Sequence, residues 1–310
     1  MTTYATALTA ARDAAGSQNY PQASLYLVAT PIGNLADIGL RALHVLQMVD
    51  TVACEDTRHT QSLLRAYGIE RPATQLLALH QHNEREATGQ VVLRLRQGQR
   101  VAYVSDAGTP GVSDPGARLV AALAAEGLAV VPIPGASSVT AALSVAGLEA
   151  PAGDDGFVFA GFLPAKAGDR ATRVAALAGE SRPVVLLEAP HRIAALAEAL
   201  AALGERPLTI GRELTKQFEQ IVTLPAAQFA PWLAADSHRS RGEFVLVLHG
   251  RPVAGPADDG VRILTLLLAE LPLKTAVRLA VEITGAPRNR LYDAALALRA
   301  RTGDDATGSA

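Results

Sequence analysis

The first half of the chain alternates short apolar runs with longer stretches of helical spacing. Gly, Pro or polar residues bound the runs, which lie at 25–30, 51–54, 76–79, 101–105 and 129–133. Strand-like runs separated by helix-length segments indicate strand–helix–strand units, whose strands pair in parallel through right-handed crossovers. We therefore expect an N-terminal α/β domain over residues 24–150 with a mostly parallel sheet.

A second series of strand-like runs follows the Pro-, Gly- and Asp-rich stretch PAGDDG at 151–156. These runs lie at 157–161, 184–188, 208–213, 220–224 and 243–248. The last three have the spacing of hairpins, which favours a mixed sheet. The change in composition predicts a domain boundary, and so a second α/β domain over 151–250.

The two ends of the chain lack this alternation. Residues 1–23 carry Arg12 and Asp13 where a signal peptide would be apolar, so we expect a disordered tail. Residues 251–260 have the composition of a linker. A helical extension over 257–301 then contains two helices joined at 285–287, which resemble a helix-turn-helix unit.

The helical extension is locally basic. Between Leu271 and Arg301 it has six basic residues against two acidic ones. Such a surface would suit RNA, although an amphipathic helix pair with ordinary surface charge is an alternative of equal weight.

The longest charge-free stretch, residues 127–148, has the length of a membrane span. Pro132, Pro134 and Gly135 interrupt it, so a strand, a turn and a small-residue helix fit better. We expect no membrane contact and a cytoplasmic location.

The amino-acid composition narrows the possible classes of protein further. Of 310 residues, 49% are hydrophobic, which excludes disorder for most of the chain, and the net charge of −2 confines any nucleic-acid contact to local patches. The single cysteine, Cys54, rules out an internal disulfide and cysteine-rich metal centres.

Several common catalytic motifs are missing from the sequence. It has no Walker A loop, no G-x-G-x-x-G fingerprint, no G-x-S-x-G elbow and no H-E-x-x-H helix. His80 and His82 could bind a metal from one strand face, but no supporting ligand set accompanies them, so we expect none.

Three loops of small residues follow predicted strands. They are ATPIGN (29–34), SDAGTPGVSDPG (105–116) and PIPGASS (132–138). Parallel sheets bind ligands at the carboxyl ends of their strands, and small residues let the backbone approach a ligand closely. Asp106 could accept hydrogen bonds from an amino group or a ribose, or could cap its own turn.

Polar clusters also follow strands, in EDTRHT (55–60), LHQHNE (79–84), EAPHR (188–192) and GRELTK (211–216), with Lys166 in FLPAK (162–166). A solvated helix start capped by Asp56 or Thr57 would explain the acids of the first cluster, but it explains Arg58 and His59 less well. Five clusters at the same kind of strand end favour a shared polar cleft.

In this order the loops and clusters resemble the tetrapyrrole-methylase superfamily and, more narrowly, the ribosomal RNA small subunit methyltransferase I family, over roughly residues 24–300. The resemblance implies two α/β domains with a cofactor cleft between them and a small C-terminal helical extension. It implies S-adenosylmethionine as methyl donor and, as target, the ribose 2′-hydroxyl of a cytidine in 16S ribosomal RNA, free or in the small ribosomal subunit. It also implies a homodimer.

Position by position, the resemblance assigns the cofactor contacts. They are Pro31, Ile32, Gly33, Val104, Ser105, Asp106, Thr109, Ser137, Ser138, Leu187 and Glu188.

Methyl transfer is an in-line displacement, for which a protein mainly aligns the reacting groups. A ribose hydroxyl is a weak nucleophile, so we expect a residue that takes its proton. The candidates are Glu55, Asp56, His59, His80 and Glu84, and the sequence does not choose among them. The cations suited to RNA phosphates are Arg58, Lys166, Arg192 and Lys216.

The sequence is also compatible with two other functions. One is a small-molecule methyltransferase acting on a tetrapyrrole-type substrate, and the other is a non-catalytic RNA-binding factor on the same fold.

Overall fold

The computed structural model of the chain describes residues 4–80, 82–113, 116–148, 156–251 and 256–304. Contacts divide the chain into two units. One contains Met1–Ala150 and Asp155–Gly250, and the other contains Arg251–Ala310 with four residues at 151–154. No helix among the described residues is long and apolar enough to cross a bilayer.

The first sheet is parallel throughout. Its strands are β1 (Ser24–Val28), β2 (Thr51–Cys54), β3 (Leu76–Ala78), β4 (Val101–Val104) and β5 (Ala129–Ile133), in the order β3-β2-β4-β1-β5. Every residue of β2 and β4 is buried, as the continuous apolar runs of a covered parallel sheet require. The parallel α/β architecture expected from the sequence is confirmed.

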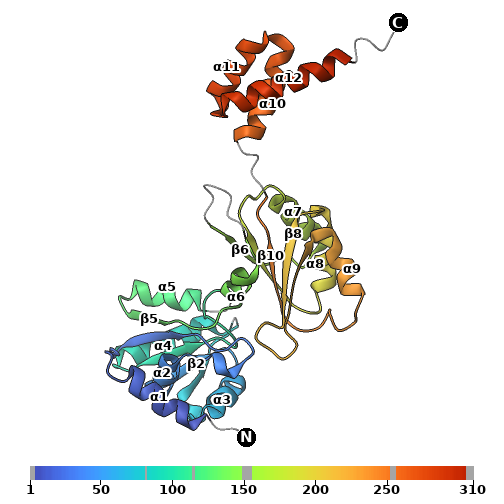
Figure 1. The fold of residues 1–310 in the computed structure, drawn as a ribbon. Helices are drawn as coiled ribbons and strands as arrows, with labels where there is room; N and C mark the ends of the chain where they lie inside the picture. Colours follow the sequence, from blue (N-terminus) through green and yellow to red (C-terminus); the bar gives the residue numbers. More distant parts are fainter. Residues whose placement is uncertain (1–3, 81, 114–115, 149–155, 252–255, 305–310) are drawn as a thin grey trace. The chain divides into compact units, whose positions relative to one another are not determined.

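Helices cover both faces of this sheet (Figure 1). They are α1 (Ala5–Ala15), α2 (Leu40–Met48), α3 (Thr57–Ala66), α4 (Glu84–Arg96) and α5 (Ala117–Ala125). Residues of the first three share a core with Tyr26, Val52 and Ala102, whereas α4 and α5 pack with Leu25 and Tyr103 on the opposite face.

The expected disordered tail over residues 1–23 is wrong for residues 5–15, which form α1. Ala11 is fully buried and Ala15 nearly so, and Tyr20 closes the same core beside the ring of His44. The small side chains four residues apart give α1 a narrow apolar stripe, which packs against α2 despite the charges of Arg12 and Asp13.

The second sheet is mixed, as predicted. Its strands are β6 (Val158–Phe162), β7 (Val184–Glu188), β8 (Pro207–Arg212), β9 (Gln220–Pro225) and β10 (Phe244–Leu248), in the order β6-β7-β10-β8-β9. β6 and β7 are parallel, and every other neighbouring pair is antiparallel. The expected boundary near residue 151 lies outside the described residues.

Helices α7 (Ala167–Leu177), α8 (Ile193–Leu200) and α9 (Phe229–Ala234) cover one face of the second sheet. The other face receives α6 (Ser138–Val145), although this helix follows the last strand of the first sheet. Val139 and Ala142 of α6 pack with Val185 and Val245, and Ile32 from the loop after β1 joins the same cluster. The two sheets are therefore connected by packing near the loops that follow β1 and β5.

Short 3-10 turns occur at Leu35–Asp37, Ala73–Gln75, Ala201–Leu203 and Ala226–Gln228.

The second unit consists of helices drawn in orange and red in Figure 1: α10 (Pro256–Glu270), α11 (Leu273–Thr284) and α12 (Arg288–Asp304). Leu264, Val277 and Leu291 form its small core. Gly285 ends α11 with a φ of +69°, a conformation that favours glycine, and so produces the turn expected between two helices. The linker expected over 251–260 is too long, because the helix begins at Pro256, a residue suited to a first helical turn.

Candidate functional site

Two of the small-residue loops meet at the carboxyl edge of the first sheet. Thr30 and Gly108 exchange backbone hydrogen bonds of 2.9 and 3.1 Å, which join the loop after β1 to the loop after β4. Gly108 has a φ of +81°, so this approach depends on a glycine. The convergence predicted for these loops is therefore present.

Two hydroxyl groups fix the shape of these loops. Ser105 is buried, and its Oγ lies 3.3 Å from the carbonyl oxygens of both Ala107 and Gly108. Thr109 Oγ1 donates to the carbonyl of Ala136 at 3.0 Å, which ties the loop after β4 to the loop after β5.

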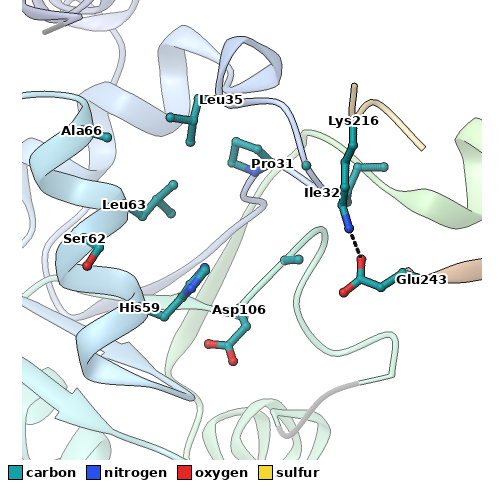
Figure 2. Close-up of a pocket in the computed structure, with 12 residues that line it drawn as sticks. Pro31, Ile32, Leu35, His59, Ser62, Leu63, Ala66, Asp106, Lys216 and Glu243 are labelled. Atoms are coloured by element: carbon teal, nitrogen blue, oxygen red, sulfur yellow. Dashed lines mark hydrogen bonds and ion pairs between the residues drawn. The ribbon is translucent and has the colours of Figure 1, made fainter. Parts of the chain in front are cut away.

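These loops line a cavity of about 400 Å³ (Figure 2). Its lining residues are Pro31, Ile32, Gly33, Leu35, His59, Ser62, Leu63, Ala66, Asp106, Ala107, Lys216 and Glu243. The loop after β1, helix α3, the loop after β4 and two residues of the second α/β domain thus enclose one space.

Helix α3 brings His59 to the cavity. Asp56 caps the helix, accepting from the backbone N–H groups of Arg58 at 2.8 Å and His59 at 3.3 Å. These backbone hydrogen bonds lower the pKa of Asp56. The backbone N–H of Asp56 in turn donates to Asp106 Oδ1 at 3.2 Å, which links the ends of β2 and β4.

The second domain contributes a lysine held by two carboxylates. Lys216 Nζ lies 2.8 Å from Glu213 Oε1 and 3.1 Å from Glu243 Oε2. In Figure 2 the Lys216–Glu243 pair lies across the cavity from His59 and helix α3. Burial alone would lower the pKa of Lys216, but its hydrogen bonds to the two carboxylates raise it.

A smaller cavity of about 80 Å³ shares several walls with the first. It is lined by Ile32, Ala107, Ser138, Leu214, Glu243 and Val245. Ile32, Ala107 and Glu243 therefore face both spaces.

The cofactor residues assigned by resemblance divide into two groups. Pro31, Ile32, Gly33 and Asp106 line the larger cavity, and Ser138 lines the smaller one. Val104, Ser105, Thr109, Ser137, Leu187 and Glu188, all of them described, line neither.

Four residues of this second group lie in the core or at the end of an element. Val104 is buried in the core, Ser137 is the residue before α6, and Leu187 packs against Ile32 and Leu214. The side chain of Glu188 is 1% exposed, with Oε1 accepting from the backbone N–H of Ala189.

Of the five candidate proton acceptors, all in the described part of the chain, His59 alone lines the cavity. Asp56 acts as a helix cap, and Glu84 is buried, with its carboxylate near the N–H of Gly116 and the guanidinium of Arg118. Glu55 follows β2 and is half-buried. His80 is also half-buried, and its Nδ1 has no hydrogen-bond partner among the described residues.

The four candidate phosphate contacts differ in exposure. The Arg58 side chain is 93% exposed, and Lys166 is exposed before α7. Arg192, in contrast, donates to the carbonyl of Leu163 and lies 3.1 Å from Glu188 Oε1, and Lys216 is paired as described. Arg58 and Lys166 therefore face solvent, whereas Arg192 and Lys216 are held in ion pairs with carboxylates.

Sequence reasoning missed six lining residues of the larger cavity: Leu35, Ser62, Leu63, Ala66, Ala107 and Glu243. Ser62, Leu63 and Ala66 follow His59 at helical spacing, so the face of α3 that carries His59 could have indicated them. Glu243 precedes an apolar strand, and its place in the cavity depends on how the two sheets pack.

The described residues bear on two further kinds of site, a metal centre and a cysteine nucleophile. No group of three or more His, Cys, Asp or Glu side chains within the described residues could hold a metal ion. Cys54 is fully buried, and burial raises the pKa of its thiol to about 11, so it is protonated at neutral pH.

Comparison with known proteins agrees with the two α/β domains and the helical unit described above. A family model described as tetrapyrrole (corrin/porphyrin) methylases matches residues 24–230, and one described as the RsmI C-terminal HTH domain matches residues 254–299. Among solved structures, uroporphyrin-III-C-methyltransferase from Thermus thermophilus superposes with a TM-score of 0.53 over 74% of this chain and 94% of that chain. Its 21% identity supports the fold alone.

Two relatives with higher identity carry the same name. The "Ribosomal RNA small subunit methyltransferase I" of Pseudomonas aeruginosa is 49% identical over 282 residues, covering 88% of this chain and 96% of the relative. The protein of the same name from Escherichia coli O157:H7 is 45% identical over 285 residues, covering 90% and 97%. The chain therefore belongs to the ribosomal RNA small subunit methyltransferase I family, within the tetrapyrrole methylases.

Proposed function

We propose that this chain transfers a methyl group from S-adenosylmethionine to the ribose 2′-hydroxyl of a cytidine in small-subunit ribosomal RNA. The observation that carries the proposal is 49% identity to a relative named as a ribosomal RNA small subunit methyltransferase, over nearly the whole length of that relative. The helix-turn-helix unit is included in the resemblance, which favours RNA over a tetrapyrrole-type substrate or mere RNA binding.

The larger cavity suits the methyl donor in size and chemistry. Its volume of about 400 Å³ falls in the range of roughly 300–1,000 Å³ typical of small-molecule sites. Pro31, Ile32 and Leu63 supply apolar walls, and Gly33 and Ala107 leave the backbone accessible. The donor, when bound, supplies an electrophilic methyl carbon on a sulfonium sulfur.

Asp106 is the residue best suited to hold the donor. One of its oxygens accepts from the backbone N–H of Asp56, and the other accepts no hydrogen bond from the described residues. This free oxygen can accept from hydroxyl or amino groups of the donor. Ser105 and Thr109 support the role indirectly, because their hydroxyls fix the backbone on either side.

We assign to His59 the proton of the 2′-hydroxyl. As the candidate base that lines the cavity, it would accept the proton through a ring nitrogen while the oxygen attacks the methyl carbon. Arg58, the residue before it, is exposed and suited to an adjacent RNA phosphate, and Lys166 could hold a second one.

The same family resemblance supports a homodimer that acts in the cytoplasm, on free ribosomal RNA or on the small subunit.

The test is methylation of small-subunit RNA taken from cells that lack the protein. With methyl-labelled S-adenosylmethionine, we expect label in a single cytidine whose 3′ linkage resists alkali, because a methylated 2′-oxygen cannot attack the neighbouring phosphate. Label on a base, transfer to a tetrapyrrole precursor instead of RNA, or RNA binding without transfer would contradict the proposal.

A further inference from the structure

Glu243 has an unusual place in the site. It lines both the larger and the smaller cavity, although it comes from the second sheet, directly before β10. Its Oε2 lies 3.1 Å from Lys216 Nζ, whereas its Oε1 accepts no hydrogen bond from the described residues. One oxygen of this carboxylate is thus anchored and the other is left for a ligand (Figure 2).

The turn that holds Glu243 is built with strain. Glu213 and Thr215 have φ values of +52° and +68°, in the left-handed region that residues with a side chain rarely adopt. Glu213 Oε1 accepts from the backbone N–H of Glu243 at 2.9 Å, while the N–H of Glu213 donates to the carbonyl of Glu243 at 3.0 Å. Strained backbone that persists at a cavity wall indicates a functional constraint.

Glycine makes the contact between this turn and the first domain possible. A Cβ on Gly33 would lie 2.4 Å from Lys216 Cγ and 2.9 Å from Thr215 Oγ1. The loop after β1 and the 213–216 turn therefore touch directly, and the position of Glu243 is set relative to the walls around Ile32.

The charges at this cavity are predominantly negative. Asp106 and Glu243 line the cavity, and Glu213 Oε1 lies 2.8 Å from Lys216 Nζ. Lys216 is the one ammonium group on the described lining, and two of these three carboxylates share it. The wall thus presents more negative than positive charge to whatever binds.

Resting on the function proposed above, we propose that Glu243 makes the cavity prefer the cationic methyl donor over its demethylated product. S-adenosylmethionine carries a sulfonium charge, and S-adenosylhomocysteine has lost that charge together with the methyl group. The two are otherwise the same molecule. A carboxylate held near the sulfur attracts the first by Coulomb interaction and not the second. The methyl transfer itself then weakens product binding.

The experiment measures dissociation constants of both compounds by titration calorimetry, for the full-length wild type and for Glu243→Gln. The glutamine keeps the size of the side chain and removes its charge. We expect the preference for S-adenosylmethionine over S-adenosylhomocysteine to fall by about threefold to tenfold, the size of a single charge interaction in a solvated site, because the Glu243 side chain is 71% exposed. The affinity for S-adenosylhomocysteine should change little. Glu198→Gln, an equal charge change on α8 away from both cavities, should leave the preference unchanged.

A second variant, Lys216→Met, should change the preference for S-adenosylmethionine in the opposite direction. Lys216→Met keeps the aliphatic chain against Gly33 but removes the neutralising charge, so the preference for the cation should increase. In the wild type, added salt should reduce the preference, a measurement that needs no variant. An unchanged preference in a Glu243→Gln protein that still binds S-adenosylhomocysteine would overturn this inference and leave the proposed function standing. If the wild type bound neither compound, the proposed function itself would fail.

Discussion

At the scale of single residues, the carboxylates of the site have two different tasks. Asp56, Glu84 and Asp106 each accept from a backbone N–H group, but of these three only Asp106 lines the cavity, together with Glu243. A carboxylate that lines a cavity and has an unoccupied oxygen there is available to a ligand.

Asp106→Ala tests the cavity-facing role. Removing a charged acceptor should weaken binding of S-adenosylmethionine by about 1–3 kcal/mol. Titration calorimetry gives this value, and thermal unfolding shows whether the link to Asp56 is also needed for the fold. Asp169→Ala, which alters an exposed carboxylate in the first turn of α7, serves as the control. Equal donor affinity in wild type and a folded Asp106→Ala protein would remove Asp106 from the site.

His59→Ala tests the proton acceptor. Loss of general-base catalysis should reduce kcat on the order of 10²–10⁴-fold, with the donor dissociation constant unchanged. Single-turnover methylation of RNA measures the first quantity and calorimetry the second. His238→Ala, an exposed histidine that does not line the cavity, should retain full activity. Normal turnover by His59→Ala would move the role to another group.

At the scale of elements, we expect one partly buried polar pair to make the stability of the second sheet depend on pH. His249 follows β10, and its Nε2 lies 2.8 Å from Thr209 Oγ1 of β8. Burial, together with the nearby Arg206 charge, lowers the pKa of His249, so the folded state disfavours its protonated form.

The pH dependence of stability follows from this shift. The unfolded chain takes up the His249 proton at a higher pH than the folded protein, so stability is greatest above about pH 6.5. It should be lost as the pH falls from there through the lower, folded-state pKa. Urea unfolding at pH 7.5 and at pH 5.5 measures the loss, and His249→Gln should make it smaller. His44, whose pKa burial also lowers, adds to the effect in both proteins. An identical pH dependence in the variant would contradict this account.

The elements could be predicted where their patterns are local. The apolar runs indicated the ten strands found among the described residues, and the parallel-edge rule placed the loop after β1 beside the loop after β4. Helix α1 was missed because its alanines bury little area each and charged residues lie between them. Glu84 could not be distinguished from a catalytic base by sequence, because the partner of its carboxylate, Gly116, is 32 residues away.

At the scale of the whole molecule, one unit contains the complete candidate site. All lining residues of both cavities belong to Met1–Ala150 or Asp155–Gly250, and the helix-turn-helix unit is separate. The contribution of Glu243 could not be predicted from sequence, because it depends on the packing of Leu214 and Ile32 between the two sheets.

Deletion of residues 251–310 tests whether the helical unit binds RNA while the cavity alone binds the methyl donor. Donor affinity should stay within about twofold of the wild type, because the cavity is intact. The KM for RNA should rise by roughly tenfold or more and become less dependent on salt, because basic residues such as Arg288 and Arg290 are lost. Calorimetry and initial-rate kinetics provide the two values. An unchanged KM would assign the extension a purely structural role.

The most direct test of the central claim is a crystal structure of the full chain grown with S-adenosylmethionine. We predict the donor in the larger cavity, with a hydroxyl or amino group on Asp106, its sulfur on the side of Glu243 and its methyl group directed toward His59. Density for the donor at any other place, or an empty cavity at saturating concentration, would contradict the account.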